Sequence, residues 1–123
     1  MLFLSGEDII RIARRVIGPD VVIRDPGLIE AASARPQATV GGHYAYADVS
    51  SMAAALTHSL VTNHALVDGN KRLGLACLIV FLRINGVRLS LSNDDAYDLI
   101  YGIASGDIRD VDDIARTIEA AGA

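Results

Sequence analysis

The residues best suited to chemistry stand in one short run, His64 to Arg72, with the sequence HALVDGNKR. The run follows a stretch with helical apolar spacing and precedes a strongly apolar stretch that begins at Leu73. Its polar side chains are therefore expected at the N-terminus of the second helix. Free backbone N–H groups and the helix dipole make such an end a site for anions.

The basic residues of the run strengthen this expectation. We expect free backbone N–H groups at Gly69, Asn70 and Lys71, and Lys71 and Arg72 add two full positive charges. Cations are normally unfavourable at a helix N-terminus, so their presence indicates a negatively charged ligand. Phosphate is the simplest one. Lys71 is also the single lysine of a chain that has ten arginines, which indicates that a compact point charge is needed there.

The remaining polar residues fit a reaction at that phosphate. Asp68 is suited to hold Mg²⁺ against phosphate oxygens, and Asn70 can donate a hydrogen bond without adding charge. His64 can take a proton from an attacking hydroxyl. The set predicts a phosphoryl or nucleotidyl transferase, although each residue taken singly is also typical of a polar loop, and Asp-Gly-Asn is common in turns.

The composition of the chain indicates its domain organisation and excludes some classes of function. A chain of 123 residues with 51% hydrophobic and 21% charged residues predicts a single folded domain over 1–123. The net charge of −4 has no basic block, which argues against direct binding of nucleic acid. The longest apolar stretch, Leu73 to Leu82, is too short for a membrane span, and no signal peptide is visible. We therefore expect a cytoplasmic protein, with Cys77 as a buried structural thiol.

Capping signals and apolar spacing predict the elements that position the run. Helices are expected from the cap Ser5 to Val16, from the cap Asp25 to about Ala34, from Asp48 to about Asn63, from Leu73 to Ile84, from the cap Asn93 to Gly106, and from the cap Asp110 to near Gly122. The segment 35–47 is expected to be a loop. The predicted fold is an all-α bundle of about six helices around the hydrophobic helix 73–84.

The run resembles the signature of the Fic/Doc family, in which a histidine and an acidic residue precede an asparagine and basic residues. It is most similar to the Doc branch, because the Fic branch has glycine at the position of Lys71 and a second arginine at that of Leu75. Residues 25–30 (DPGLIE), 35–37 (RPQ) and 81–87 (FLRINGV) also match Doc-like motifs. The resemblance covers nearly the whole chain.

This resemblance implies a specific function. Doc proteins are toxins of toxin–antitoxin pairs that a Phd-like antitoxin neutralises, and they use ATP and Mg²⁺ to phosphorylate a threonine of elongation factor Tu, which stops translation. Carried over to this chain, His64 is the catalytic base and Asp68 is the magnesium ligand. The ATP phosphates are bound by Gly69, Asn70, Lys71 and Arg72.

The sequence departs from the family pattern at two positions, and three other functions are possible. Family members often have proline at the position of Ala65 and phenylalanine at that of Leu66, so we expect the loop to be held less precisely. An AMP transferase of the Fic type, a catalytically silent antitoxin-binding protein and, more remotely, a nuclease are the other functions considered.

Several residues outside the run are candidates for structural or functional roles. We expect His43 and His58 to be structural or exposed, because neither has a partner at the spacing of metal ligands. Tyr44 and Tyr46 are candidates for docking the target protein, and Arg35 is a weaker candidate for reaching the active site. The acidic residues Asp94, Asp95 and Asp98 are explained by a favourable interaction with a helix dipole.

Overall fold

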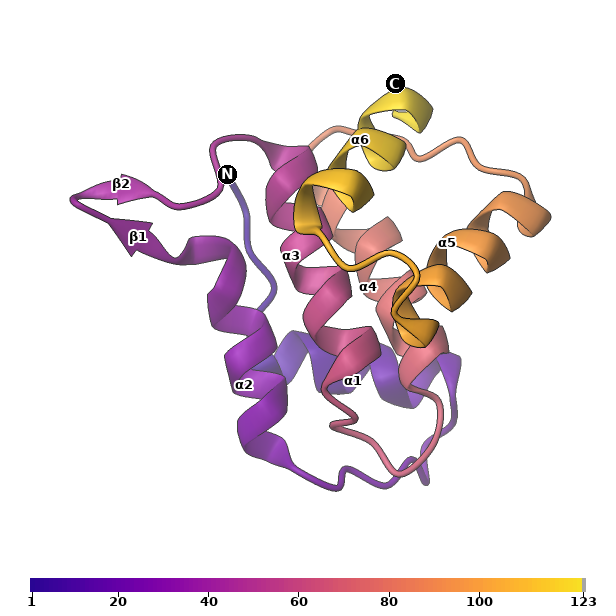
Figure 1. Ribbon diagram of the computed structural model, residues 1–123. Coiled ribbons are helices and arrows are strands. Elements are labelled where there is room, and N and C mark those ends of the chain that lie inside the picture. Colours follow the sequence, from indigo (N-terminus) through magenta and orange to yellow (C-terminus); the bar gives the residue numbers. More distant parts are fainter. Residues whose placement is uncertain (123) are drawn as a thin grey trace.

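Six α-helices and one short hairpin form the fold of the computed structural model, which describes residues 1–122 (Figure 1). The helices are α1 (Gly6–Val16), α2 (Pro26–Ala34), α3 (Val49–Thr62), α4 (Asn70–Ile84), α5 (Asn93–Ser105) and α6 (Val111–Ala121). Between α2 and α3, a 3₁₀ turn (Arg35–Gln37) leads into the strands β1 (Thr39–Val40) and β2 (His43–Tyr44). The predicted all-α bundle is confirmed. None of the described helices is long and apolar enough to cross a membrane.

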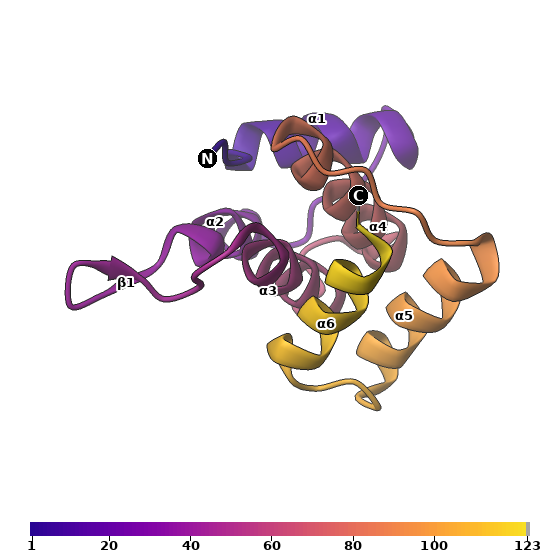
Figure 2. The same cartoon turned by 90° about the horizontal axis from the view of Figure 1, so that it is seen from above.

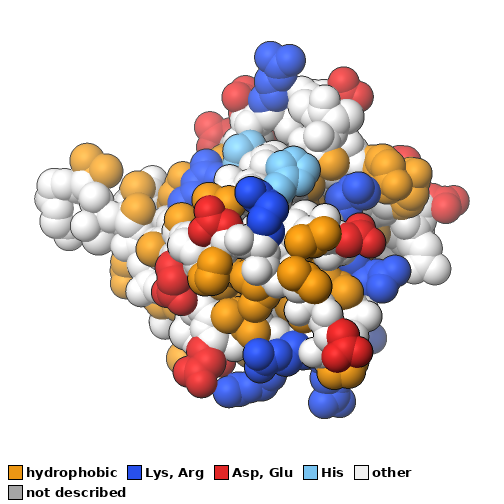
Figure 3. Space-filling view, turned by 90° about the horizontal axis from the view of Figure 1, so that it is seen from below, with side chains coloured by type: hydrophobic (Ala, Val, Ile, Leu, Met, Phe, Trp, Pro, Cys, Tyr) orange, Lys and Arg blue, Asp and Glu red, His pale blue; other side chains and the backbone are white. Residues whose placement is uncertain are grey.

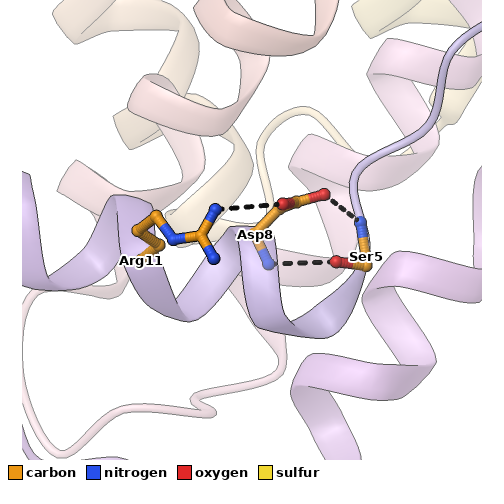
Figure 4. A network of polar contacts seen from close by, with 3 residues as sticks. All are labelled: Ser5, Asp8 and Arg11. Atoms are coloured by element: carbon orange, nitrogen blue, oxygen red, sulfur yellow. Dashed lines mark hydrogen bonds and ion pairs between the residues drawn. The ribbon is translucent and has the colours of Figure 1, made fainter.

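The predicted cap of the first helix is confirmed. At α1 the Ser5 hydroxyl accepts a hydrogen bond from the Asp8 N–H (3.1 Å), and the Asp8 carboxylate accepts one from the Ser5 N–H (2.9 Å; Figure 4). The backbone N–H of Ser5, then its hydroxyl, lowers the pKa of Asp8, and Arg11 lies 3.7 Å from the same carboxylate. This reciprocal pair satisfies two N–H groups that the helix itself leaves unbonded.

Two other helix starts were located to within one residue. Asp25 caps α2 as predicted and accepts a hydrogen bond from the Gly27 N–H at 2.9 Å. The prediction that Asn93 caps α5 is wrong by one position, because Ser92 is the cap and accepts from the Asp95 N–H at 3.0 Å. Serine and asparagine are about equally good caps, so their preference could not distinguish the two neighbours.

A pair of helices, α3 and α4, forms the centre of the molecule. The expected central helix α4 buries Leu73, Leu78 and Phe81 on the side that faces α3 and α1. Helix α3 is buried from Met52 to Thr57 and again from Ser59 to Val61, and it contacts α2, α4, α5 and α6 (Figures 1 and 2). As predicted, Cys77 is buried, and this burial raises the pKa of its thiol to about 12.

The hairpin was not predicted, because the segment 35–47 was expected to be a loop. Thr39 pairs with Tyr44 and Val40 with His43, and Gly41 and Gly42 make the turn with φ of +59° and +83°. Only glycine adopts two such angles in succession without strain, so this dipeptide favours a tight hairpin turn. The hairpin projects from the side of the bundle (Figure 1).

Arg35 attaches the base of this hairpin to α3. Its guanidinium donates hydrogen bonds to the Tyr46 hydroxyl (3.1 Å) and the Ser59 hydroxyl (3.0 Å), and lies 2.9 Å from Nδ1 of His58. Since arginine can only donate, Nδ1 of His58 must accept and carry no proton. Burial, and then the charge of Arg35, lowers the pKa of His58. His58 is therefore structural, as expected, and Arg35 serves the packing of the hairpin and α3.

The close contact of α3 and α4 gives a prediction about Gly74. A Cβ added there would lie 2.5 Å from Cγ2 of Val61, which is buried and branched at Cβ. Overpacking costs about 1–3 kcal/mol and exceeds the helix preference of alanine, so Gly74→Ala should lower the free energy of unfolding by about 1–2 kcal/mol in urea denaturation.

The contact itself can be isolated by a double-mutant cycle. Gly74→Ala combined with Val61→Ala should be less destabilised than the sum of the single variants by at least about 0.5 kcal/mol. Ile79→Leu, on the exposed side of α4, is the control and should stay within about 0.5 kcal/mol of the wild type. Strictly additive effects would show that Val61 does not limit the space at Gly74.

Candidate active site

The loop between α3 and α4 carries the predicted site residues, and a segment from far earlier in the chain fixes its backbone. Ile23 and Leu66 form an antiparallel bridge. The Arg24 N–H donates to the Ala65 carbonyl at 2.8 Å, and the Val67 N–H donates to the Val22 carbonyl at 3.1 Å. The loop is therefore held on its outer side by residues that precede α2.

Leu66 and Asn70 fix the loop from inside. Leu66 is 1% exposed, so its leucine side chain fills the apolar site at this position. The side chain of Asn70 accepts a hydrogen bond from the Leu66 N–H and donates one to the Leu66 carbonyl, both at 3.0 Å. Asn70 thus closes the loop onto the first residue of α4. One N–H of its amide remains available for a ligand.

Gly69 is the N-cap of α4 and has a left-handed conformation with φ of +95°. A side chain there would also collide with Ile17, whose Cδ1 atom lies 2.6 Å from the position of a Cβ. The expectation that the Gly69 N–H is free is wrong, because it donates to the Asp68 carboxylate at 2.9 Å. The free amides lie one residue later: among the described residues, no acceptor is found for the N–H groups of Asn70, Lys71 and Arg72.

A cleft of about 530 Å³ opens at this helix start, a volume typical of small-molecule sites. One wall is made by Asp68 and by residues 69–72, so the predicted magnesium ligand and phosphate-binding residues lie together. The opposite wall comes from α5, with Tyr97, Ile100 and Tyr101. Lys71 and Arg72 are both exposed, which leaves their charges available to a ligand.

His64 lies at the other end of the same loop and does not line the cleft. Its side chain is exposed, and its backbone has φ of +55°, the one positive φ at a residue other than glycine in the described part of the chain. Figure 3 views the molecule from the loop side and shows histidine beside Lys or Arg side chains near the centre of that face. A base placed there can meet a hydroxyl that arrives from solvent.

Arg24 holds this strained backbone in place, and sequence reasoning missed it. Its Nε donates to the His64 carbonyl at 2.8 Å, Nη2 donates to the same oxygen, and Nη2 also reaches the Asn63 carbonyl at 3.4 Å. An arginine fork that binds one carbonyl twice fixes its direction as well as its position. No periodicity or cap marks Arg24, so the sequence alone does not reveal a contact with a residue forty positions later.

Comparison with known proteins identifies the family of the chain. A family model described as the Fic/DOC family matches residues 3–82, which include α1 to α3, the loop and most of α4. The chain belongs to the Fic/DOC family. The family predicted from the loop signature is thereby confirmed.

Two curated relatives extend this result along the chain. A protein named Toxin Doc from Mycolicibacterium smegmatis is 46% identical over 118 residues, which cover 94% of this chain and 90% of that protein. A protein named Protein kinase doc from Escherichia phage P1 is 34% identical over 94 residues, which cover 76% of this chain and 72% of that protein. The similarity to both relatives therefore reaches well beyond the loop.

The donor set for Mg²⁺ can be tested against the structure. No group of three or more histidine, cysteine or acidic side chains that could hold a metal ion lies within residues 1–122. Asp68 is a single exposed carboxylate beside Lys71 and Arg72 in the lining of the cleft. Mg²⁺ is commonly held by one or two carboxylates together with phosphate oxygens and water. The site therefore fits an ion that is bound together with a phosphate ligand.

The double hydrogen bond of Asn70 gives a prediction. Asn70→Ala leaves the buried N–H of Leu66 without a partner, so the free energy of unfolding should fall by about 1–3 kcal/mol. Hydrogen exchange at Leu66 should also become faster. Asn93→Ala is the matched control, because Asn93 lines the same cleft and makes no side-chain hydrogen bond within residues 1–122. Unchanged protection of the Leu66 amide would contradict the role assigned to Asn70.

Proposed function

We propose that this chain is the toxin of a toxin–antitoxin pair and an ATP-dependent protein kinase. It transfers the γ-phosphate of ATP to a threonine hydroxyl of elongation factor Tu and stops translation, and a Phd-like antitoxin neutralises it. The observation that carries the proposal is the cleft in which three free amides, Lys71 and Arg72 meet Asp68. The relatives' names, Toxin Doc and Protein kinase doc, support the same assignment.

The proposed reaction is a direct displacement at the γ-phosphorus. His64 takes the proton of the threonine hydroxyl, and the hydroxyl oxygen attacks phosphorus as the bond to the β–γ bridging oxygen breaks and ADP leaves. Lys71, Arg72 and the amides of residues 70–72 stabilise the negative charge on the phosphate oxygens. Mg²⁺, when held by Asp68, neutralises part of the same charge. His64 then returns its proton to solvent.

Transfer of AMP is the nearest alternative. The two positions that distinguish the branches are Lys71 and Leu75, and both line the cleft, so a change at either one alters how a nucleotide lies in it. A lysine adds charge at the helix start, and a leucine removes the second arginine that would grip another phosphate. Both features favour the kinase. The retention of His64, Asp68, Asn70 and Arg72 argues against a catalytically silent antitoxin-binding protein.

The kinase can be tested with two labels. The purified chain is incubated with Mg²⁺, elongation factor Tu and ATP labelled at the γ- or the α-phosphate. We expect label from the γ-position alone, and His64→Ala should reduce it by at least about a hundredfold because the base is lost. His43→Ala, an exposed histidine on β2, is the matched control and should retain activity. Label from the α-position would identify an AMP transferase, and no label would refute this target.

Arg24 gives a second test, which separates positioning from ATP binding. Arg24→Gln should lower kcat by about 10- to 100-fold, because the backbone that carries His64 is no longer fixed. The KM for ATP should stay unchanged, since Arg24 lies outside the cleft. Arg24→Lys should recover part of the rate, and Arg88→Gln, an exposed arginine, is the control. A raised KM with unchanged kcat would show that Arg24 acts on the nucleotide instead.

A further inference from the structure

Two tyrosines on α5 form a stacked pair at the edge of the cleft. Tyr97 and Tyr101 are four residues apart, so their side chains lie on one face of the helix. Their ring centroids are 4.1 Å apart and the planes are inclined by 20°. The side chains remain 56% and 46% exposed, and both line the cleft. The pair therefore offers flat aromatic surface to a ligand instead of filling the core.

This aromatic pair adjoins the phosphate-binding end directly. The Nζ atom of Lys71 lies 5.2 Å from the centre of the Tyr101 ring, within the range of a cation–π interaction. The same cleft thus presents cations and free amides on α4 and aromatic rings on α5. Ala96 and Ile100 complete an apolar wall beside the rings. A ligand that fits both halves has an anionic group joined to a flat, aromatic one.

We propose that Tyr97 and Tyr101 form the platform on which the purine base of the nucleotide substrate stacks. This inference rests on the proposed function, and it specifies how ATP lies in the cleft. The phosphates face Lys71 and Arg72, and the adenine lies against the tyrosine pair across the cleft. Purines stack well on tyrosine because both present extended π-faces, and such stacking does not require hydrogen bonds to the base edge.

The exposure of the pair separates this role from a structural one. Aromatic side chains spaced by four residues on a helix surface stabilise the helix by only a few tenths of a kcal/mol. Removing one ring should therefore leave the fold intact. A change in nucleotide affinity then reports on the ligand and not on unfolding.

The experiment compares two probes in calorimetric titrations of the full chain with Mg²⁺ present. ATP carries base and phosphates, whereas inorganic tripolyphosphate carries the phosphates alone. Tyr97→Leu should weaken the binding of ATP by about 5- to 30-fold and change that of tripolyphosphate less than about twofold, since base stacking alone is lost. Tyr97→Phe keeps the ring and should bind ATP like the wild type. Tyr44→Leu, an exposed tyrosine on β2, is the matched control.

Tyr101→Leu is a second variant that also removes the cation–π partner of Lys71, so it should weaken the binding of tripolyphosphate slightly and that of ATP more strongly. Two results would overturn the platform: a wild type and leucine variants that bind ATP equally well, or leucine variants that lose ATP and tripolyphosphate to the same extent. In either case the transfer of γ-label to elongation factor Tu still reports on the kinase separately. A wild type that binds neither probe would refute the proposed function, and the platform with it.

Discussion

The backbone pairing of residues 22–24 with residues 65–67 determines the position of the loop that carries the candidate active site. The loop between α3 and α4 exposes Val67 and Asp68 and buries only Ala65 and Leu66. Its shape depends on hydrogen bonds from outside, which Val22 and Arg24 supply. Because these residues directly precede the cap of α2, the packing of α2 against α3 is coupled to the position of His64.

The sequence predicted the parts of the fold that depend on local interactions. The capping box at Ser5 and the cap at Asp25 are contacts within three residues, so residue types suffice to locate them. The hairpin was missed although Gly41-Gly42 is a strong turn signal, because each strand has only two residues and shows no alternation. Its attachment through Arg35 depends on residues in α3, which no local pattern reveals.

The residues of the candidate site were predicted from the sequence, but the contacts that bring them together were not. The signature named Asp68 and residues 69–72, and the structure gathers them in one cleft. The signature could not show that the Asn70 side chain forms hydrogen bonds with Leu66. It also could not show that α5 provides the aromatic wall on the opposite side of the cleft. Both facts arise from tertiary packing. Spacing can show that residues lie at one helix end, but the elements that face that end are set by the whole chain.

The two ends of the loop, His64 and Gly69, both have positive φ angles, and they meet this constraint in different ways. Gly69 takes a left-handed conformation at no steric cost, and a side chain there would have to displace the end of the Ile17 side chain. His64 has a similar φ but carries a Cβ, which costs about 1–2 kcal/mol. Asparagine or glycine would also fit that backbone, so the conformation by itself does not require a histidine there. Arg24 offsets this strain by donating hydrogen bonds to the His64 carbonyl. The strained backbone of His64 is therefore stabilised at the residue where the strain occurs.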